Sequence, residues 1–234
     1  MEIRFMVRSL AAVAVSAALA APALAADTVK LAGFTHNPAA SVTLTDSSNS
    51  LKNYSGGAGQ FYGTLNGASF ATYCTELLES FTWNQGDPVL NTYSVVSGIT
   101  AWGAAKSTAM DQLMSYAFTA GLPTNADTSA AVQSAIWEVL NENNTTSPYS
   151  FKNGNLLISA TPASSTQAAL DSMNLVLANL GSYAITQHVD QLHNGTQQDF
   201  LVMAPVPEPE SYAMLLAGLG IVGAVARRRR SAEA

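Results

Sequence analysis

The stretch YSGGAGQFYGTLNGASFATYC, residues 54–74, decides how this chain folds. It consists of short runs with apolar and polar residues in alternation, separated by Gly and Asn, a pattern typical of strands joined by tight turns. We therefore expect a β-hairpin whose second strand delivers Cys74. This residue is the single cysteine in a sequence of 234 residues.

The same texture continues on both sides of the hairpin. Residues 29–53 are rich in Gly, Ser, Thr and Asn and include the alternating run ASVTLTD at 40–46, which predicts further strands. Residues 79–98, ESFTWNQGDPVLNTYSVVSG, repeat the pattern around a turn at Gly86, Asp87 and Pro88.

Helical spacing of apolar residues begins near Ala104. Three helices are predicted, within 104–121, 125–143 and 164–181, and we expect Asp127, Thr128 or Ser129 to cap the second one. Two closing strands are expected within 183–191 and 197–205. The order of strands, helices and strands predicts an α+β domain over residues 26–205, with antiparallel strands and an inserted helical part.

The two ends of the chain have the composition of targeting segments. Residues 1–25 have a basic start, a short apolar run and an A-x-A end, which predicts a signal peptide cleaved after Ala25. At the other end, VPEPESYAMLLAGLGIVGAVARRRR (206–230) places an apolar segment at 211–226 before four arginines. This segment is just long enough to be a transmembrane helix, with the arginines on the cytoplasmic side.

The C-terminal segment resembles the PEP-CTERM sorting signal of Gram-negative bacteria. Its three parts are the triplet Pro207, Glu208 and Pro209, the apolar helix, and the cluster Arg227, Arg228, Arg229 and Arg230. The resemblance implies processing by an exosortase, a membrane protease-transpeptidase, and an association with exopolysaccharide or biofilm production. We thus expect a secreted protein whose precursor lies in the inner membrane and whose mature form lies at the cell surface or in the extracellular matrix.

The charge of the predicted domain excludes one class of partner. Between residues 26 and 206 there are four lysines, no arginine and twelve carboxylates, for a net charge of −8. Such a surface repels phosphate, so the sequence argues against nucleic-acid binding and against electrostatic attachment to anionic lipid.

An unpaired cysteine in an exported protein calls for an explanation, because cysteines in oxidising compartments normally occur in pairs. Gln133, in AVQSAIW (131–137), is a second unusual residue, since its side chain borders the apolar face of a predicted helix. On periodicity alone, Gln133 bonds a neighbouring loop or lies at the wet margin of the core.

Considered together, TYC (72–74) on a strand and VQSAIW (132–137) on a helix resemble the bacterial thioester domain of surface adhesins. The resemblance implies that Cys74 and Gln133 form an internal thioester, and that Tyr73, Ala135, Ile136 and Trp137 are the packing around it. It also implies covalent adhesion to an amine or hydroxyl group on a surface. Tyr73, Trp83 and Trp137 are equally consistent with ordinary core aromatics.

Two rival interpretations of the domain stay open. One is a non-reactive structural component of an exopolysaccharide matrix with Cys74 as a buried thiol. The other is a Cys-dependent hydrolase, whose base would be His36, His188 or His193.

Other site patterns are weak in this sequence. HVDQLH (188–193) predicts no metal site, because His188 and His193 point to opposite faces of a strand. We expect Glu76 and Glu79 to face water rather than to form a glycosidase pair. The sequence therefore predicts no enzyme, no cofactor and no metal.

Overall fold

The computed structural model describes residues 26–37, 39–47, 51–81, 83, 91–143, 149–160, 164–204, 218, 219 and 222, with only the backbone given for 51–54. The strands are β1 (Asp27–Phe34), β2 (Ala40–Asp46), β3 (Leu51–Ala58), β4 (Phe61–Leu65), β5 (Ala68–Thr72), β6 (Thr92–Val96), β7 (Leu156–Ser159), β8 (Val189–His193) and β9 (Phe200–Met203). The helices are α1 (Gly98–Trp102), α2 (Ala104–Thr119), α3 (Ala126–Asn141), α4 (Ser165–Ala178) and the 3₁₀ helix Leu180–Ser182.

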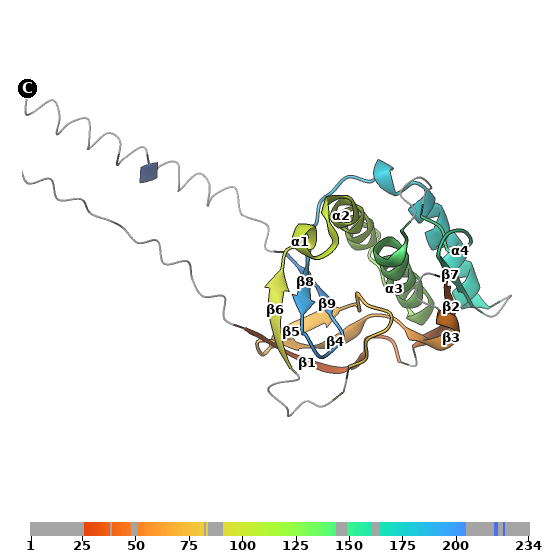
Figure 1. The fold of residues 1–234 in the computed structure, drawn as a ribbon, viewed down its shortest axis with the longest axis horizontal. Coiled ribbons are helices and arrows are strands. Elements are labelled where there is room, and N and C mark those ends of the chain that lie inside the picture. Colours follow the sequence, from red (N-terminus) through yellow and green to blue (C-terminus); the bar gives the residue numbers. More distant parts are fainter. Residues whose placement is uncertain are drawn as a thin grey trace, which may run out of the picture.

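The described strands form two antiparallel sheets. One has the order β5-β4-β1-β6-β8-β9 and the other the order β3-β2-β7. Figure 1 shows α2, α3 and α4 next to one another, with α3 between the other two helices. The protein is therefore α+β with a helical part inserted between strands, as the order of sequence patterns predicts.

The predicted hairpin is formed by β4 and β5. Its two-residue turn consists of Asn66 at φ 53° and Gly67 at φ 82°. Positive φ at both central positions is the geometry whose twist matches that of the flanking strands, and Asn-Gly adopts it at the lowest cost. The second strand ends at Thr72, so Cys74 lies just beyond β5 rather than on it.

The segment after β5 closes the large sheet. Leu201 N–H donates to Tyr73 O at 3.0 Å, Thr75 N–H donates to Asp199 O at 3.0 Å, and Cys74 forms an isolated antiparallel bridge with Phe200. Because β5 and β9 are the two outermost strands of that sheet, these bonds curl the sheet back on itself.

Helix α3 forms the centre of the core. All residues from Ser129 to Val139 are buried, so the helix is covered on every side and not only along one apolar stripe. The N-cap lies two to four residues before the predicted caps. Asn125 is the N-cap, and its side chain and that of Thr128 form a reciprocal capping box with the backbone.

The remaining sequence-based predictions differ from the structure in extent, and strand β7, between α3 and α4, was not predicted. Helices α2 and α4 lie within the predicted ranges, whereas the closing strands are shorter, at Val189–His193 and Phe200–Met203. The predicted turn at 86–88, the signal peptide and the processing triplet lie outside the described residues. Within the described part of the chain, no helix combines the length and apolar character needed for a membrane crossing. Of the predicted span 211–226, only residues 218, 219 and 222 are described.

Candidate functional site

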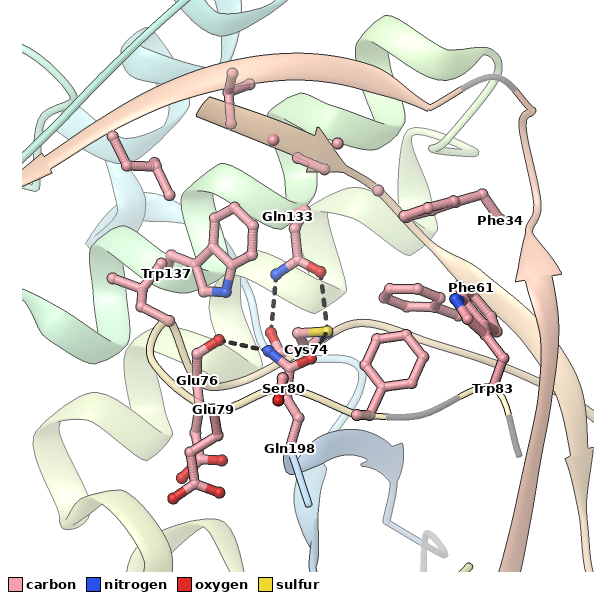
Figure 2. Close-up of a pocket in the computed structure, with 18 residues that line it drawn as sticks. Phe34, Phe61, Cys74, Glu76, Glu79, Ser80, Trp83, Gln133, Trp137 and Gln198 are labelled. Atoms are coloured by element: carbon pink, nitrogen blue, oxygen red, sulfur yellow. Dashed lines mark hydrogen bonds between the residues drawn. The ribbon is translucent and has the colours of Figure 1, made fainter. Parts of the chain in front are cut away.

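Cys74 and Gln133, which are 59 positions apart in the sequence, lie against each other in the core. Cys74 N–H donates to Gln133 Oε1 at 2.9 Å, and Gln133 Nε2 donates to Cys74 O at 2.8 Å (Figure 2). Gln133 is 1 % exposed and Cys74 is 3 % exposed. The Gln133 amide thus pairs with the Cys74 backbone as a neighbouring strand would, and this pairing satisfies a buried polar group that would otherwise be costly.

This pairing has a chemical consequence for the acyl group of Gln133. A backbone N–H that donates to the side-chain carbonyl oxygen polarises the carbonyl and stabilises negative charge on that oxygen. The Gln133 amide nitrogen is held separately by Cys74 O. The Cys74 backbone therefore bonds both ends of the Gln133 side-chain amide and fixes its orientation.

Gln198 is a third member of this site, which the sequence analysis did not identify. Cys74 Sγ donates to Gln198 Oε1 at 2.9 Å, and Gln198 Nε2 donates to Glu76 O at 2.8 Å. Because Gln198 immediately precedes the Asp199–Phe200 segment that pairs with Thr75 and Cys74, closure of the sheet brings it to the thiol. Nothing in the local sequence distinguishes Gln198 from its neighbour Gln197.

The environment keeps the Cys74 thiol in its neutral form. Burial raises the thiol pKa well above its ordinary value, and the negative charge of Glu76 raises it further. A thiolate is the reactive form of cysteine, so this thiol is a poor nucleophile toward molecules in solution.

A cavity of about 310 Å³ opens in front of the Cys74–Gln133 pair. Its lining includes the aromatic residues Phe34, Phe61, Phe81, Trp83 and Trp137 beside aliphatic and polar residues. The ring centroids of Phe61 and Phe81 are 5.1 Å apart, and those of Phe81 and Trp83 are 4.7 Å apart. Such edge-to-face contacts stabilise an apolar wall beside the acyl group.

The predicted packing residues divide between two sides of the strand. Trp137 and Trp83 line the cavity with Cys74, whereas Tyr73 lines a separate apolar groove with Met114 and Phe118. Neighbouring residues of an extended segment point to opposite sides, so Tyr73 cannot face the cavity that Cys74 faces. Ala135 and Ile136 are fully buried in the α3 core.

Two of the three histidines named as possible bases, His188 and His193, bond carboxylates. His188 Nδ1 lies 2.7 Å from Asp111 Oδ2, and His193 Nδ1 lies 2.8 Å from Asp199 Oδ2. The bond to Asp199 and the nearby negative charges raise the pKa of His193. The structure thus places His188 and His193 in pairs with aspartates, while the Cys74 thiol bonds an amide.

The two glutamates near Cys74 behave differently from each other. Glu79 is exposed, as expected. Glu76 does not simply face water, because its Oε2 accepts the Asp199 backbone N–H at 3.0 Å. Burial raises the pKa of Glu76. Because it also bonds the Asp199 backbone, this carboxyl group is part of a cluster with Asp199 and His193 and differs from a free surface charge.

In the described part of the chain, no three His, Cys, Asp or Glu side chains are grouped so that they could hold a metal ion.

Comparison with protein families gives a match, at residues 205–230, to the PEP-CTERM protein-sorting motif. No curated protein and no solved structure matches the chain. The C-terminal motif implies an exported protein with a membrane-anchored precursor that an exosortase processes.

Proposed function

We propose that the exported domain forms an internal thioester between Cys74 and Gln133 and uses it to attach covalently to nucleophiles at the cell surface or in the extracellular matrix. The observation that carries the proposal is the double hydrogen bond between the Gln133 amide and the Cys74 backbone. It places an amide and the only thiol of the chain together in a buried position.

The formation step joins Cys74 Sγ to the side-chain carbonyl carbon of Gln133. The C–N bond of the amide breaks, the thiol hydrogen is transferred to the departing nitrogen, and one ammonia leaves. Cys74 N–H donates to the oxygen that becomes negative in the tetrahedral intermediate, which is where a preorganised donor lowers the barrier. The buried core lowers the barrier further, because it holds the reacting groups in a fixed orientation and largely excludes water.

The attachment step consumes the thioester. An amine or hydroxyl attacks the Gln133 carbonyl carbon, the C–S bond breaks, and the hydrogen of the attacking group ends on Cys74 sulfur. The raised thiol pKa favours this last proton transfer, because the thiolate that leaves is strongly basic in its buried environment. The product is an amide or ester on Gln133, formed once per molecule.

Intact-mass measurement of the purified mature protein tests this proposal. We expect a mass lower by one ammonia than the sequence requires. Methylamine treatment should then raise this mass by one methylamine, because the amine opens the thioester. Cys74→Ala and Gln133→Ala each remove one partner and should abolish both effects, whereas Gln197→Ala, next to Gln198, should leave them unchanged. An unmodified wild-type mass with a thiol that titrates freely after unfolding contradicts the thioester.

A non-reactive structural component of an exopolysaccharide matrix is the second candidate. The hydrogen bond from Cys74 Sγ to Gln198 Oε1 favours it, because a satisfied, neutral and buried thiol is stable as such. The same mass measurement separates the two candidates. A buried thiol predicts the full sequence mass, and Cys74→Ala then changes stability without changing any adduct.

A Cys-dependent hydrolase is less well supported by this site. It requires a thiolate activated by a base, whereas here the thiol pKa is raised and Cys74 Sγ donates to the Gln198 amide oxygen. Repeated turnover of an ester or amide that fails in Cys74→Ala would favour this function over the other two.

A further inference from the structure

Gln198 places a second buried amide at the Cys74 thiol. Cys74 Sγ donates to Gln198 Oε1 at 2.9 Å, and both residues line the cavity in front of the Gln133 amide. Gln198 is 7 % exposed, so this bond lies in the buried part of the site. The proposed thioester takes its acyl group from Gln133 and so far gives no role to this second amide.

The hydrogen bonds of Gln198 determine which end of its amide faces the thiol. Gln198 Nε2 donates to the backbone oxygen of Glu76 at 2.8 Å (Figure 2). A backbone oxygen only accepts, so the amide nitrogen must face Glu76 and the amide oxygen must face Cys74. The thiol is therefore the donor in its contact with Gln198.

The chain around Gln198 keeps this acceptor in place. Gln198 N–H donates to Ser80 O at 3.3 Å, and the Tyr93 hydroxyl donates to Gln198 O at 3.3 Å. The next residue, Asp199, accepts from Thr75 N–H at 3.0 Å through its backbone oxygen. The same sheet closure that positions Cys74 thus positions Gln198, so the acceptor is preorganised.

An acceptor at this point assists a thiol that attacks in its neutral form. Burial and the charge of Glu76 raise the pKa of the Cys74 thiol, so the thiol keeps its hydrogen as it approaches Gln133. As sulfur bonds to carbon, it loses electron density and its hydrogen becomes strongly acidic. A hydrogen bond from this S–H group therefore strengthens in the transition state, and that difference lowers the barrier.

We propose, on the basis of the thioester function, that Gln198 assists thioester formation by accepting the hydrogen of the Cys74 thiol while the sulfur attacks Gln133. The sulfur forms a C–S bond with the Gln133 side-chain carbon, and one electron pair of the C=O bond moves to the oxygen. The thiol hydrogen, shared with Gln198 Oε1, then passes to the Gln133 nitrogen, which in this intermediate is an amine and binds a proton more strongly than an amide oxygen does. The C=O bond re-forms, the C–N bond breaks, ammonia leaves, and Gln198 is unchanged.

The experiment measures the rate of thioester formation in the mature protein. Chains produced in unfolded form, with thiol and amide intact, are refolded, and the loss of one ammonia is followed by intact mass. Tryptophan fluorescence reports folding separately. Gln198→Leu removes the acceptor and keeps a side chain of similar size. We expect it to slow the loss of ammonia by about 10- to 100-fold, the effect of one hydrogen bond to a group that becomes charged.

Gln198→Glu separates an acceptor from a purely structural role. While the introduced carboxyl group is protonated, its carbonyl oxygen can accept from the thiol and its O–H can donate to Glu76 O, as the amide does. When the group ionises, it loses the donor to Glu76 O but accepts the thiol hydrogen more strongly. The rate of ammonia loss relative to wild type should therefore rise with pH as this group ionises. A purely structural role predicts a fall instead, because ionisation breaks the bond to Glu76.

The matched control is Gln197→Leu, at the neighbouring residue, whose amide donates to Thr196 O. It should form the thioester at the wild-type rate. A wild-type rate in Gln198→Leu overturns the proposal, and so does a relative rate in Gln198→Glu that stays flat or falls with pH. The second measurement decides if Gln198→Leu does not fold.

Two further outcomes concern the thioester itself. An ammonia deficit that persists in Gln133→Ala and is lost in Gln198→Leu would make Gln198 the acyl donor, which contradicts the role proposed for it. A wild-type protein without the ammonia deficit contradicts the thioester and, with it, this proposal. A wild-type protein with the deficit and a wild-type rate in Gln198→Leu leaves the thioester standing and overturns the role of Gln198 alone.

Discussion

At the residue scale, buried polar groups on α3 differ in how completely they are bonded. Gln133 has both ends of its amide paired with Cys74. Glu138 is fully buried, yet only its Oε1 accepts a bond, from Ser150 N–H at 2.8 Å, while Oε2 has no partner among the described residues. Burial raises the pKa of Glu138 to about 8, so the group is protonated in the folded protein at neutral pH.

The raised pKa of Glu138 predicts a pH-dependent stability. Its ordinary pKa is 4.5 and its folded value is about 8, so the folded state holds a proton that the unfolded state has lost in this window. The contribution of Glu138 to the free energy of unfolding should therefore be largest below pH 4.5 and should fall as the pH rises to about 8. Glu138→Gln cannot ionise, so its stability relative to wild type should increase across this window by roughly 3 to 5 kcal/mol. Urea unfolding at several pH values measures this difference.

Glu79→Gln is the matched control for Glu138→Gln, because Glu79 is exposed. Its unfolding curves should follow those of the wild type at every pH. Parallel pH dependence of wild type and Glu138→Gln would mean that Glu138 ionises normally in the folded protein.

At the element scale, α3 determines where the site lies. The helix is buried from Ser129 to Val139, so its rotation is set by packing on all sides. Its first turn is set by the capping box, in which Asn125 accepts from Thr128 N–H at 2.9 Å. These two constraints place Gln133 opposite Cys74, two turns into the helix.

The capping box predicts a specific loss of stability. Asn125→Ala leaves the Thr128 N–H without its side-chain acceptor, and we expect it to lower the free energy of unfolding by about 1 kcal/mol. Asn125→Ser keeps an oxygen that can accept the same bond and should cost much less. Denaturant midpoints of the two variants measure the difference. Equal midpoints for Asn125→Ala and Asn125→Ser would show that the side-chain cap contributes nothing to the stability of this protein.

At the scale of the whole molecule, sheet closure assembles the site from distant segments. The Thr72 hydroxyl donates to Leu201 O at 2.6 Å, and the Tyr73–Thr75 segment pairs with Asp199–Leu201. This closure brings Gln198 to the Cys74 thiol. The C-terminal motif at 205–230 begins two residues after β9 ends, so the sorting signal follows the last strand of the domain directly.

The sorting motif predicts how processing depends on the triplet. Replacing Pro207, Glu208 and Pro209 with alanine should leave the precursor uncut and associated with the membrane, because the triplet lies within the matched protein-sorting motif and we expect an exosortase to recognise it. Cell fractionation and the mass of the C-terminal peptide measure this. Glu210→Gln, directly after the triplet, is the control and should be processed normally. Normal processing of the triplet variant would contradict the role of the motif.

The sequence by itself determined those features that depend on local chemistry. The Asn66–Gly67 turn, the apolar spacing of α2 and α4, and the C-terminal motif can each be recognised within a short window, because turn geometry, helical periodicity and peptide motifs are local properties. The resemblance in two short motifs predicted a thioester between Cys74 and Gln133; the structure brings the two residues into hydrogen-bonded contact, and the bond itself stays a prediction.

Only the tertiary structure decided which side chains meet. The contact of Gln198 with the thiol and the separation of Tyr73 from the cavity both follow from closure of the sheet. These relations join residues up to 124 positions apart. A local pattern cannot specify them, because their energy comes from packing and hydrogen bonds that exist only once the distant strands have paired.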